Sequence, residues 1–294
     1  KTFGQNFFGF RNRYFIDKNA NMPKHVRFPK WELQVGAIER MNRAVTETSL
    51  RVKKSECLDL PPIVRQRIEV KMLPAQQKAY DEMKNDFITF YQSNACVAQL
   101  ALTKLLRLQQ IVSGFISFED GAVTNFKDSE RELALKELLE ELTPNHKVIV
   151  WAVFQQNYKI IERICEALKI KYVGVYGGIT ETQRQAAIKD FTHDEATRVY
   201  IGNPLSGGIG VNLTVSDISI YYSRDFSLES ALQSAARNHR GGSEIHQKIT
   251  HIDLITPETI DEMIAEKLRE KEVNGELLIS DSLADDIIKN VLGS

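Results

Sequence analysis

Several features that mark other protein classes are scarce or missing in this sequence. Cysteine is limited to Cys57, Cys96 and Cys165, an odd number at wide spacing, which indicates reduced core residues rather than a disulfide framework. No apolar run is long enough to span a membrane and no signal peptide is present, so we expect a cytoplasmic protein without a membrane partner. Neither charge dominates, because 38 Lys and Arg face 39 Asp and Glu.

Motifs that hold a nucleotide and its metal ion are also missing. No GxxxxGK[ST] loop occurs, and no glycine is followed by a lysine. The segment Asp194-Glu195-Ala196-Thr197 is similar to a DExx box, but it lies between an expected helix and the strand that begins near Val199. A magnesium-binding acid belongs at the carboxyl end of a hydrophobic strand. His246 and His251 have no ligand partners at metal spacing, so the sequence predicts no metal site.

Charge is unevenly distributed along the chain. Residues 11–54 contain eleven Lys and Arg against four Asp and Glu, whereas residues 253–290 contain four against eleven. The basic arm predicts contact either with a phosphate backbone or with another domain, and its interleaved aromatic residues suit packing and stacking equally. The acidic end predicts a solvated face.

Hydrophobic periodicity predicts an α/β domain with a helical insertion. Helices over 75–91 and 97–112 form a protruding pair, and a loop with Gly114 and Gly121 follows. From residue 129 onward, helices and strands alternate, which predicts a parallel sheet covered by helices on both faces. The expected helices are 129–142, 157–168, 180–191 (with a Thr180–Gln183 capping box) and 259–272, and the expected strands are 147–153, 172–176, 198–202, 217–222 and 247–255.

The most informative stretch is residues 233–242, in which Arg237 and Arg240 are three residues apart. On a helix, both side chains would project from the same face. Such a pair at the rim of an α/β domain suits a nucleoside triphosphate, because an arginine at the γ-phosphate stabilises the charge that develops during hydrolysis. An isolated pair of this kind more often marks a basic, solvated helix end. Upstream, the glycine-rich residues 207–214 follow a short apolar run and would let backbone amides approach a phosphate closely.

Taken in order, the strand 147–154, the glycine-rich loop and the arginine segment resemble motifs IV, V and VI of the second lobe of superfamily-two helicases. Residues 51–80 and 104–111 are similar to the linker and leucine-rich helix of the Swi/Snf branch of DNA-dependent ATPases, and within it to the compact versions encoded by phages and prophages. The resemblance covers roughly residues 50–272. The chain departs from the family pattern at Asn203-Pro204, where Ser-Thr is usual, and at Ser243, where glutamine is usual.

The resemblance implies a RecA-like parallel sheet, the fold of a P-loop-NTPase-like second lobe. It divides the chain into the end of lobe one with a basic crossing segment (1–50), a linker with the helical protrusion (51–125), the C-terminal lobe (126–272) and a linker with a terminal helix (273–294). Because the chain begins at Lys1 and lacks a P-loop, we expect a fragment of a bacterial or phage ATPase whose first lobe lies outside this sequence.

The resemblance also implies roles for individual residues. Arg237 and Arg240 would be arginine fingers, and Gln233, Gly208 and Gly210 would contact the nucleotide. Nucleic acid would be contacted by Asn203, Ser206, Gly207 and Asn212. ATP and Mg²⁺ would be held mainly by the absent lobe, and double-stranded DNA would be the partner. The alternative is a non-catalytic nucleic-acid-binding or docking module with a degenerate motor fold, and the choice between strand separation and duplex translocation stays open.

Overall fold

The computed structural model describes residues 3, 6–23, 28–47, 59–93, 98–118, 121–205 and 211–274. The chain forms two compact units, Lys1–Asp59 and Leu60–Ser294. In these described ranges, no helix is both long and apolar enough to cross a bilayer.

The first unit contains two helices and a hairpin. Its elements are α1 (Phe7–Tyr14), β1 (Phe15–Asp17), β2 (Trp31–Leu33) and α2 (Ala37–Thr46). β1 and β2 are antiparallel, and the carboxylate of Asp17 accepts hydrogen bonds from the backbone N–H groups of Asn19 (3.0 Å) and Lys30 (2.9 Å). The guanidinium of Arg11 lies 4.1 Å from the ring centroid of Trp31, so this cation is stacked within its own unit.

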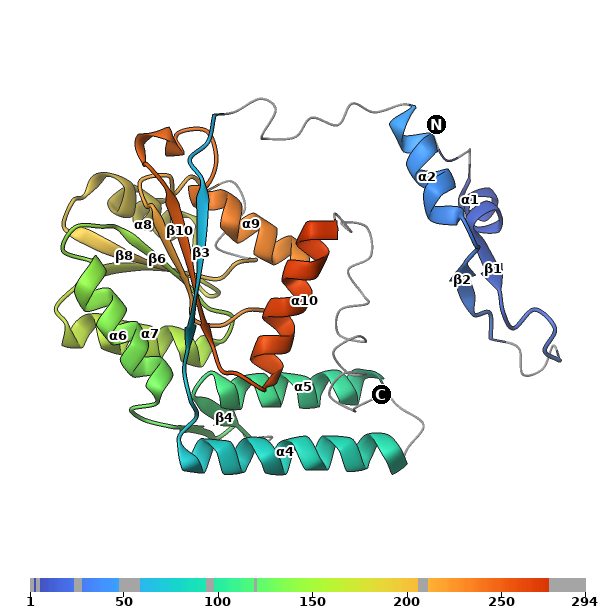
Figure 1. The fold of residues 1–294 in the computed structure, drawn as a ribbon, viewed down its shortest axis with the longest axis horizontal. Coiled ribbons are helices and arrows are strands. Elements are labelled where there is room, and N and C mark those ends of the chain that lie inside the picture. The colour runs from blue at the N-terminus through green and yellow to red at the C-terminus, as the bar shows by residue number, and fades with distance from the viewer. Residues whose placement is uncertain are drawn as a thin grey trace. The chain divides into compact units, whose positions relative to one another are not determined.

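The second unit is built on a six-stranded parallel sheet in the order β3-β10-β9-β6-β8-β7 (Figure 1). The fold class predicted from the sequence is therefore confirmed. The strands are β3 (Ile63–Glu69), β6 (Val148–Trp151), β7 (Lys171–Val175), β8 (Thr197–Gly202), β9 (Ile218–Tyr221) and β10 (Ile249–Ile255). The helices after the helical pair are α6 (Glu130–Leu142), α7 (Gln155–Ala167), α8 (Glu181–His193), α9 (Leu228–Asn238) and α10 (Ile260–Asn274).

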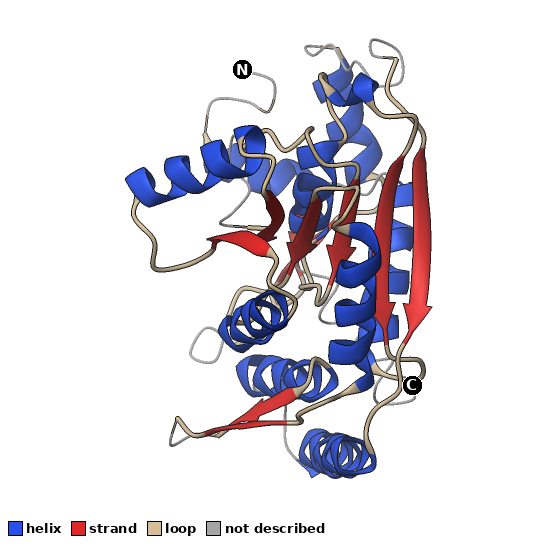
Figure 2. Cartoon of the chain, turned by 90° about the vertical axis from the view of Figure 1, so that its left-hand side faces the viewer, coloured by secondary structure: helices blue, strands red, loops and turns tan. Residues whose placement is uncertain are grey.

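Both faces of the sheet are covered, which explains why the central strand β6 is apolar at every position (Figure 2). Val148 and Val150 of β6 face α6 and α7, where they join one buried cluster. Ile149 and Trp151 face the other way and pack with Phe191 of α8 and with the segment that contains Leu213. Trp151 is fully buried, so it is a core residue.

The helical pair consists of α4 (Pro74–Ser93) and α5 (Ala98–Val112), which lie side by side beyond the carboxyl end of β3 (Figure 1). Phe87 of α4 and Leu108 of α5 are fully buried in a cluster that also contains Ile264 of α10. The hydroxyl of Tyr80 accepts a hydrogen bond from the backbone N–H of Ile260 (2.9 Å). The pair is therefore packed onto α10 rather than isolated from the domain.

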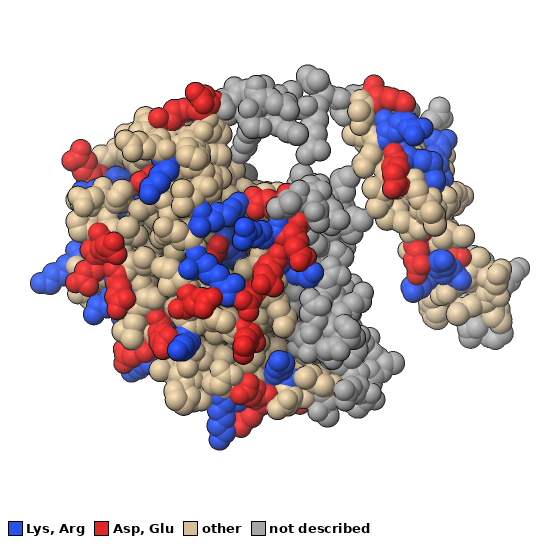
Figure 3. Space-filling model, viewed as in Figure 1, with Lys and Arg blue, Asp and Glu red and all other residues tan. Residues whose placement is uncertain are grey.

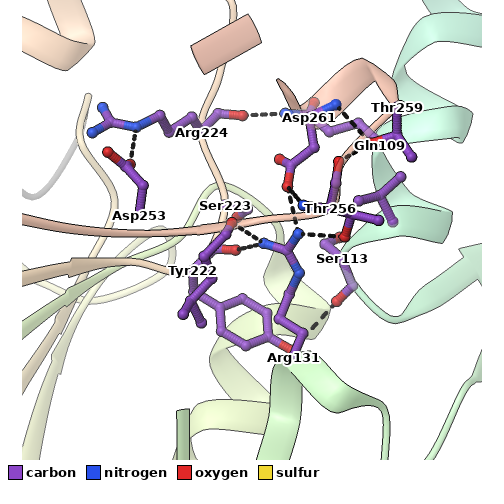
Figure 4. Close-up of polar contacts among 12 residues, drawn as sticks. Gln109, Ser113, Arg131, Tyr222, Ser223, Arg224, Asp253, Thr256, Thr259 and Asp261 are labelled. Atoms are coloured by element: carbon purple, nitrogen blue, oxygen red, sulfur yellow. Dashed lines mark hydrogen bonds and ion pairs between the residues drawn. The ribbon is translucent and has the colours of Figure 1, made fainter. Parts of the chain in front are cut away.

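A buried arginine joins three parts of the second unit (Figure 4). Arg131, in the first turn of α6, is 2% exposed and donates hydrogen bonds to the carbonyl oxygens of Tyr222 (2.6 Å) and Leu254 (2.8 Å). The same guanidinium donates to Thr256 Oγ1 (3.1 Å) and forms an ion pair with Asp261 of α10. This network ties α6 to the carboxyl ends of β9 and β10 and to the start of α10.

The sequence missed two features of this fold. Residues 63–69, expected within a linker, form the edge strand β3, which pairs in parallel with β10 along its full length. The loop expected after residue 112 contains a hairpin of β4 (Phe115–Ser117) and β5 (Val123–Asn125). The predicted helices and the Thr180–Gln183 capping box are confirmed. The predicted terminal helix lies outside the described residues.

Candidate functional site

Arg237 stands out because it is buried and, among the residues that the structure describes, forms no ion pair. It occupies the last turn of α9, a helix that begins after Ser227, whose side chain accepts a hydrogen bond from the backbone N–H of Ser230. Arg237 is only 9% exposed, and within the described part of the chain its Nε atom has no hydrogen-bond partner. Burial lowers the pKa of this guanidinium, and the charge of Arg240 lowers it further.

Arg240 is placed differently from the expectation that both arginines project from one helix face. α9 ends at Asn238, so Arg240 lies in the following loop and is exposed, whereas Arg237 is buried. The prediction of a shared helix face is therefore wrong. The helix stops because His239 leaves the helical conformation, with φ −117° and ψ 78°. The charge of Arg240 nevertheless lowers the pKa of Arg237, so the two cations still repel each other.

A third arginine, absent from the sequence-based list, joins this pair. The charge of Arg184, near the N-terminus of α8, also lowers the pKa of Arg237. Burial raises the pKa of the Tyr200 phenol strongly, more than the charges of Arg184 and Arg237 lower it, so the phenol stays neutral and supplies no counter-charge. A cation near a helix N-terminus opposes the helix dipole, and this was the signal available in the sequence for Arg184.

The end of α9 and the loop that follows it are hydrogen-bonded to Leu213 and Thr214, the last residues of the glycine-rich segment. The backbone N–H of Leu213 donates to the carbonyl of Arg237 (3.0 Å), and His246 Nε2 lies 2.7 Å from the carbonyl of Thr214. Gly242 has φ +102°, and a Cβ there would lie 3.2 Å from Thr214 Oγ1. Glycine is therefore required at this turn both for its conformation and for the close approach.

The predicted nucleic-acid residues lie along the same connection between β8 and β9. Asn203 directly follows β8, where its amide donates to the hydroxyl of Tyr158 (2.9 Å) and its Oδ1 accepts from the backbone N–H of Leu205 (2.8 Å). Asn212 is exposed, and its Oδ1 accepts from the backbone N–H of Thr214 (3.1 Å). Both asparagines therefore shape the ends of the loop. Ser206, Gly207, Gly208 and Gly210 lie outside the described residues.

Gln233 lies one turn before Arg237 on α9. Its amide donates to the carboxylate of Glu229 (2.8 Å), four residues earlier on the helix surface. The side chain is half-buried, and this bond uses only one of its two N–H donors.

The acidic tetrapeptide at Asp194 is a structural turn. The carboxylate of Asp194 accepts hydrogen bonds from Lys171 (2.8 Å) and Thr197 Oγ1 (2.7 Å). The bond from Lys171 is the main reason that the pKa of Asp194 is lowered. The turn joins α8 to β8, as predicted. Across the residues that the structure describes, no group of three or more His, Cys, Asp or Glu is placed to hold a metal ion.

A groove between β3, α9 and α10 also contains arginines, and three of them are paired. Arg224 bonds to Asp253 (2.5 Å), Arg65 to Glu272 (2.7 Å), and Arg67 forms an ion pair with Glu262. Figure 3 shows basic side chains gathered over β3 with acidic side chains beside them along α10. Because the carboxylates already balance these arginines, the groove is less suited to an anion than the surroundings of Arg237.

His251 of β10 contacts the end of α9. It is fully buried, and its Nε2 atom lies 3.2 Å from Oδ1 of Asn238, the last residue of that helix. Burial, helped by the charges of Arg65 and Arg224, lowers the pKa of His251 to about 3. The imidazole is therefore neutral in the folded protein at neutral pH.

Acid is expected to destabilise the fold through this histidine. Because the pKa of His251 falls from its ordinary 6.5 to about 3 on folding, the unfolded chain binds more protons between these values. The stabilisation is complete above pH 6.5 and is lost as the pH falls toward 3. When the pH is lowered from about 7.5 to about 5, protonation of this residue in the unfolded chain should lower the free energy of unfolding by about 2 kcal/mol. Urea unfolding at both pH values measures this change. The His251→Gln variant should lose about 2 kcal/mol less unfolding free energy than the wild type on acidification. Equal losses in the two proteins would contradict a low pKa for the buried His251.

Comparison with known proteins places these residues in context. Residues 130–242 match the family model of the helicase conserved C-terminal domain. The ATP-dependent helicase fft2 of Schizosaccharomyces pombe is 28% identical over 72% of this chain and 16% of its own length. The uncharacterized ATP-dependent helicase MG018 of Mycoplasma genitalium is 26% identical over 85% of this chain and 24% of its own length. This chain therefore spans less than a quarter of either relative.

Solved structures agree with the fold. The C-terminal part of the Fun30 ATPase domain has a TM-score of 0.60 and 20% identity, and covers 79% of this chain and 98% of its own. The Sulfolobus solfataricus SWI2/SNF2 ATPase core in complex with double-stranded DNA has a TM-score of 0.65 and 20% identity. The match covers 97% of this chain and 60% of the Sulfolobus chain. These findings support a helicase conserved C-terminal domain at residues 130–242 and a fold shared with the C-terminal parts of these solved ATPases.

Proposed function

We propose that this chain is the C-terminal motor lobe of a DNA-dependent ATPase and supplies Arg237 and Arg240 as arginine fingers. The observation that carries the proposal is the buried guanidinium of Arg237, whose Nε has no partner in the described part of the chain. A buried charge without a counter-ion is costly, so such a group is retained where an anion completes it.

A polyphosphate fits this environment better than a single carboxylate. The charges of Arg184 and Arg240 both lower the pKa of Arg237, and the phenol of Tyr200 is neutral. Guanidinium groups bind phosphate oxygens through paired hydrogen bonds. Arg237 is held by burial, whereas Arg240 is exposed and free to reach a ligand that approaches from outside. ATP would thus be clamped from this side.

The remaining parts of the nucleotide site must come from elsewhere, because this chain has no P-loop. ATP and Mg²⁺ would be held mainly by a first lobe, and Mg²⁺ would neutralise charge that develops on the phosphates. Closure of the two lobes would bring the arginines to the phosphates. The ATP-dependent helicases among the relatives support this use of ATP.

Residues 1–50 would belong to the end of the first lobe. The solved C-terminal part of Fun30 covers 79% of this chain, whereas the complete core from Sulfolobus covers 97%. The second unit, Leu60–Ser294, accounts for about four fifths of the chain, a share similar to that covered by the Fun30 fragment, which supports this assignment. Phe7, Phe8 and Phe28 are each at least 65% exposed, which suits packing against further residues of that lobe.

Double-stranded DNA would run past the connection between β8 and β9. The side chains of Asn203 and Asn212 are bonded to the ends of this connection, so contact with the DNA backbone would come chiefly from backbone amides and from Ser206 and Gly207. Phosphate contacts of this kind grip DNA without reading its sequence. The phage origin of the parent protein stays a prediction.

The isolated chain is expected to hydrolyse ATP only at the background rate, because it lacks the P-loop. Adding the first lobe as a separate polypeptide, together with duplex DNA, should restore turnover. The measurement is phosphate release by the chain alone, by the first lobe alone and by the mixture. Turnover by the isolated chain would contradict the proposal, and an upstream sequence without a P-loop or DExx box would favour the non-catalytic DNA-binding module.

A further inference from the structure

The side chain of His239 connects the arginine loop to a distant part of the chain. Its Nε2 atom lies 3.0 Å from the carbonyl oxygen of Pro61, 178 residues away in the sequence. His239 caps the end of α9 and immediately precedes Arg240. Since a carbonyl only accepts hydrogen bonds, Nε2 must carry a proton, which holds for the imidazolium and for one neutral tautomer.

Pro61 is a rigid anchor for this bond. It is buried, and the proline at position 62 restricts it to an extended conformation. The carbonyl of Pro62 accepts a hydrogen bond from the backbone N–H of Ile249 (2.9 Å), and Ile63 then pairs with Ile249 at the start of β10. The carbonyl of Pro61 is therefore fixed to the edge of the sheet.

The arginine loop is held at further points on either side of Arg240. Before it, the carbonyl of Arg237 accepts from Leu213, and after it, the backbone N–H of Ser243 donates to the carbonyl of Arg240 itself (2.9 Å). The bond of His239 adds an anchor on the β3 side, directly next to the exposed arginine. Without it, Arg240 would be held only through the loop's own turn and its contacts with residues 213–214.

We propose that His239 is a positioning residue, which holds Arg240 in place through Pro61. This inference rests on the proposed function, in which Arg240 reaches the phosphates of ATP. Pro61 is two residues after Asp59, where the first compact unit ends. The same anchor therefore fixes both the arginine loop and the first residues of the second unit.

The hydrogen bond from His239 to the carbonyl of Pro61, called the tether below, is tested on residues 1–294 by amide hydrogen exchange. His239→Ala should speed exchange of the Ser243 amide by about tenfold or more, because local opening sets that rate. His239→Gln keeps a donor that can reach Pro61 and should exchange like the wild type. His193→Ala is the matched control, since His193 is an exposed histidine of α8 whose Nδ1 lies 3.1 Å from a backbone carbonyl. Unchanged exchange in His239→Ala would overturn the tether.

The positioning role is tested on the parent polypeptide with duplex DNA. His239→Ala should lower kcat by about 10- to 100-fold with KM for ATP changed less than about twofold, because a misplaced catalytic group costs rate rather than ground-state binding. His239→Gln should recover most of the rate. If His239→Ala turns over normally while Arg240→Ala does not, the positioning role is wrong and the proposed function stands. If the wild-type parent shows no duplex-dependent hydrolysis, the proposed function falls and the catalytic role of His239 falls with it, whereas the exchange result still decides the tether.

Discussion

Replacing Arg240 with alanine in the parent polypeptide is expected to lower kcat for duplex-stimulated ATP hydrolysis by about 10³-fold, the usual contribution of an arginine finger. The physical reason is that an exposed guanidinium next to a second, buried one can bind phosphate oxygens as charge develops on them. Arg240→Lys should recover little, because an ammonium lacks the planar pair of donors. Steady-state phosphate release at saturating ATP and DNA measures the effect.

The matched control is Arg269→Ala, which removes an exposed arginine from α10 and should leave kcat unchanged within about twofold. Arg237→Ala should be as inactive as Arg240→Ala, since both would act on the same phosphates, and the double variant should be little worse than either. An Arg240→Ala enzyme with wild-type kcat would show that this residue is not a catalytic finger.

Removing the carboxylate of Asp261 is expected to destabilise the second unit by about 3–5 kcal/mol, the cost of leaving a buried partner charge uncompensated. Arg131 is 2% exposed and Asp261 is 5% exposed, so water cannot replace the lost partner. Asp261 also accepts a hydrogen bond from the backbone N–H of Thr256 (3.1 Å), which would lose its acceptor. Urea unfolding of Asp261→Ala at neutral pH gives the change directly.

Glu272→Ala provides the comparison, because it removes an ion pair of similar chemistry from the surface. Arg65 and Glu272 are 38% and 35% exposed, so this pair should contribute less than about 1 kcal/mol. If both variants lost the same small amount, the Arg131 network of Figure 4 would not be the link that holds α6, the sheet and α10 together.

Local patterns in the sequence were sufficient for most of the second unit. The capping box at Thr180 and the fully apolar run of β6 depend on near neighbours and on burial, and both are present as predicted. β3 was missed because it is an edge strand whose partner, β10, lies 186 residues later at each paired position. The alternation of Val64, Gln66 and Ile68 with Arg65 and Arg67 was the available signal.

The candidate site was harder to predict than the fold. The spacing of Arg237 and Arg240 identified both residues, but it could not reveal that α9 ends between them. Arg131 reads as an ordinary surface charge on a Glu-rich helix, and only the tertiary structure places the carbonyls of Tyr222 and Leu254 around it. The contact of His239 with Pro61 depends in the same way on the pairing of β3 with β10.

The central claim is that the arginines of this lobe complete an ATP site whose other residues belong to a first lobe. The most direct measurement is a structure of the parent polypeptide bound to duplex DNA and ADP with a beryllium fluoride mimic of the γ-phosphate. We predict that the guanidinium of Arg240 or Arg237 lies within hydrogen-bonding distance, about 3 Å, of that mimic. If both guanidinium groups remain away from the nucleotide in the closed, DNA-bound state, the account is contradicted.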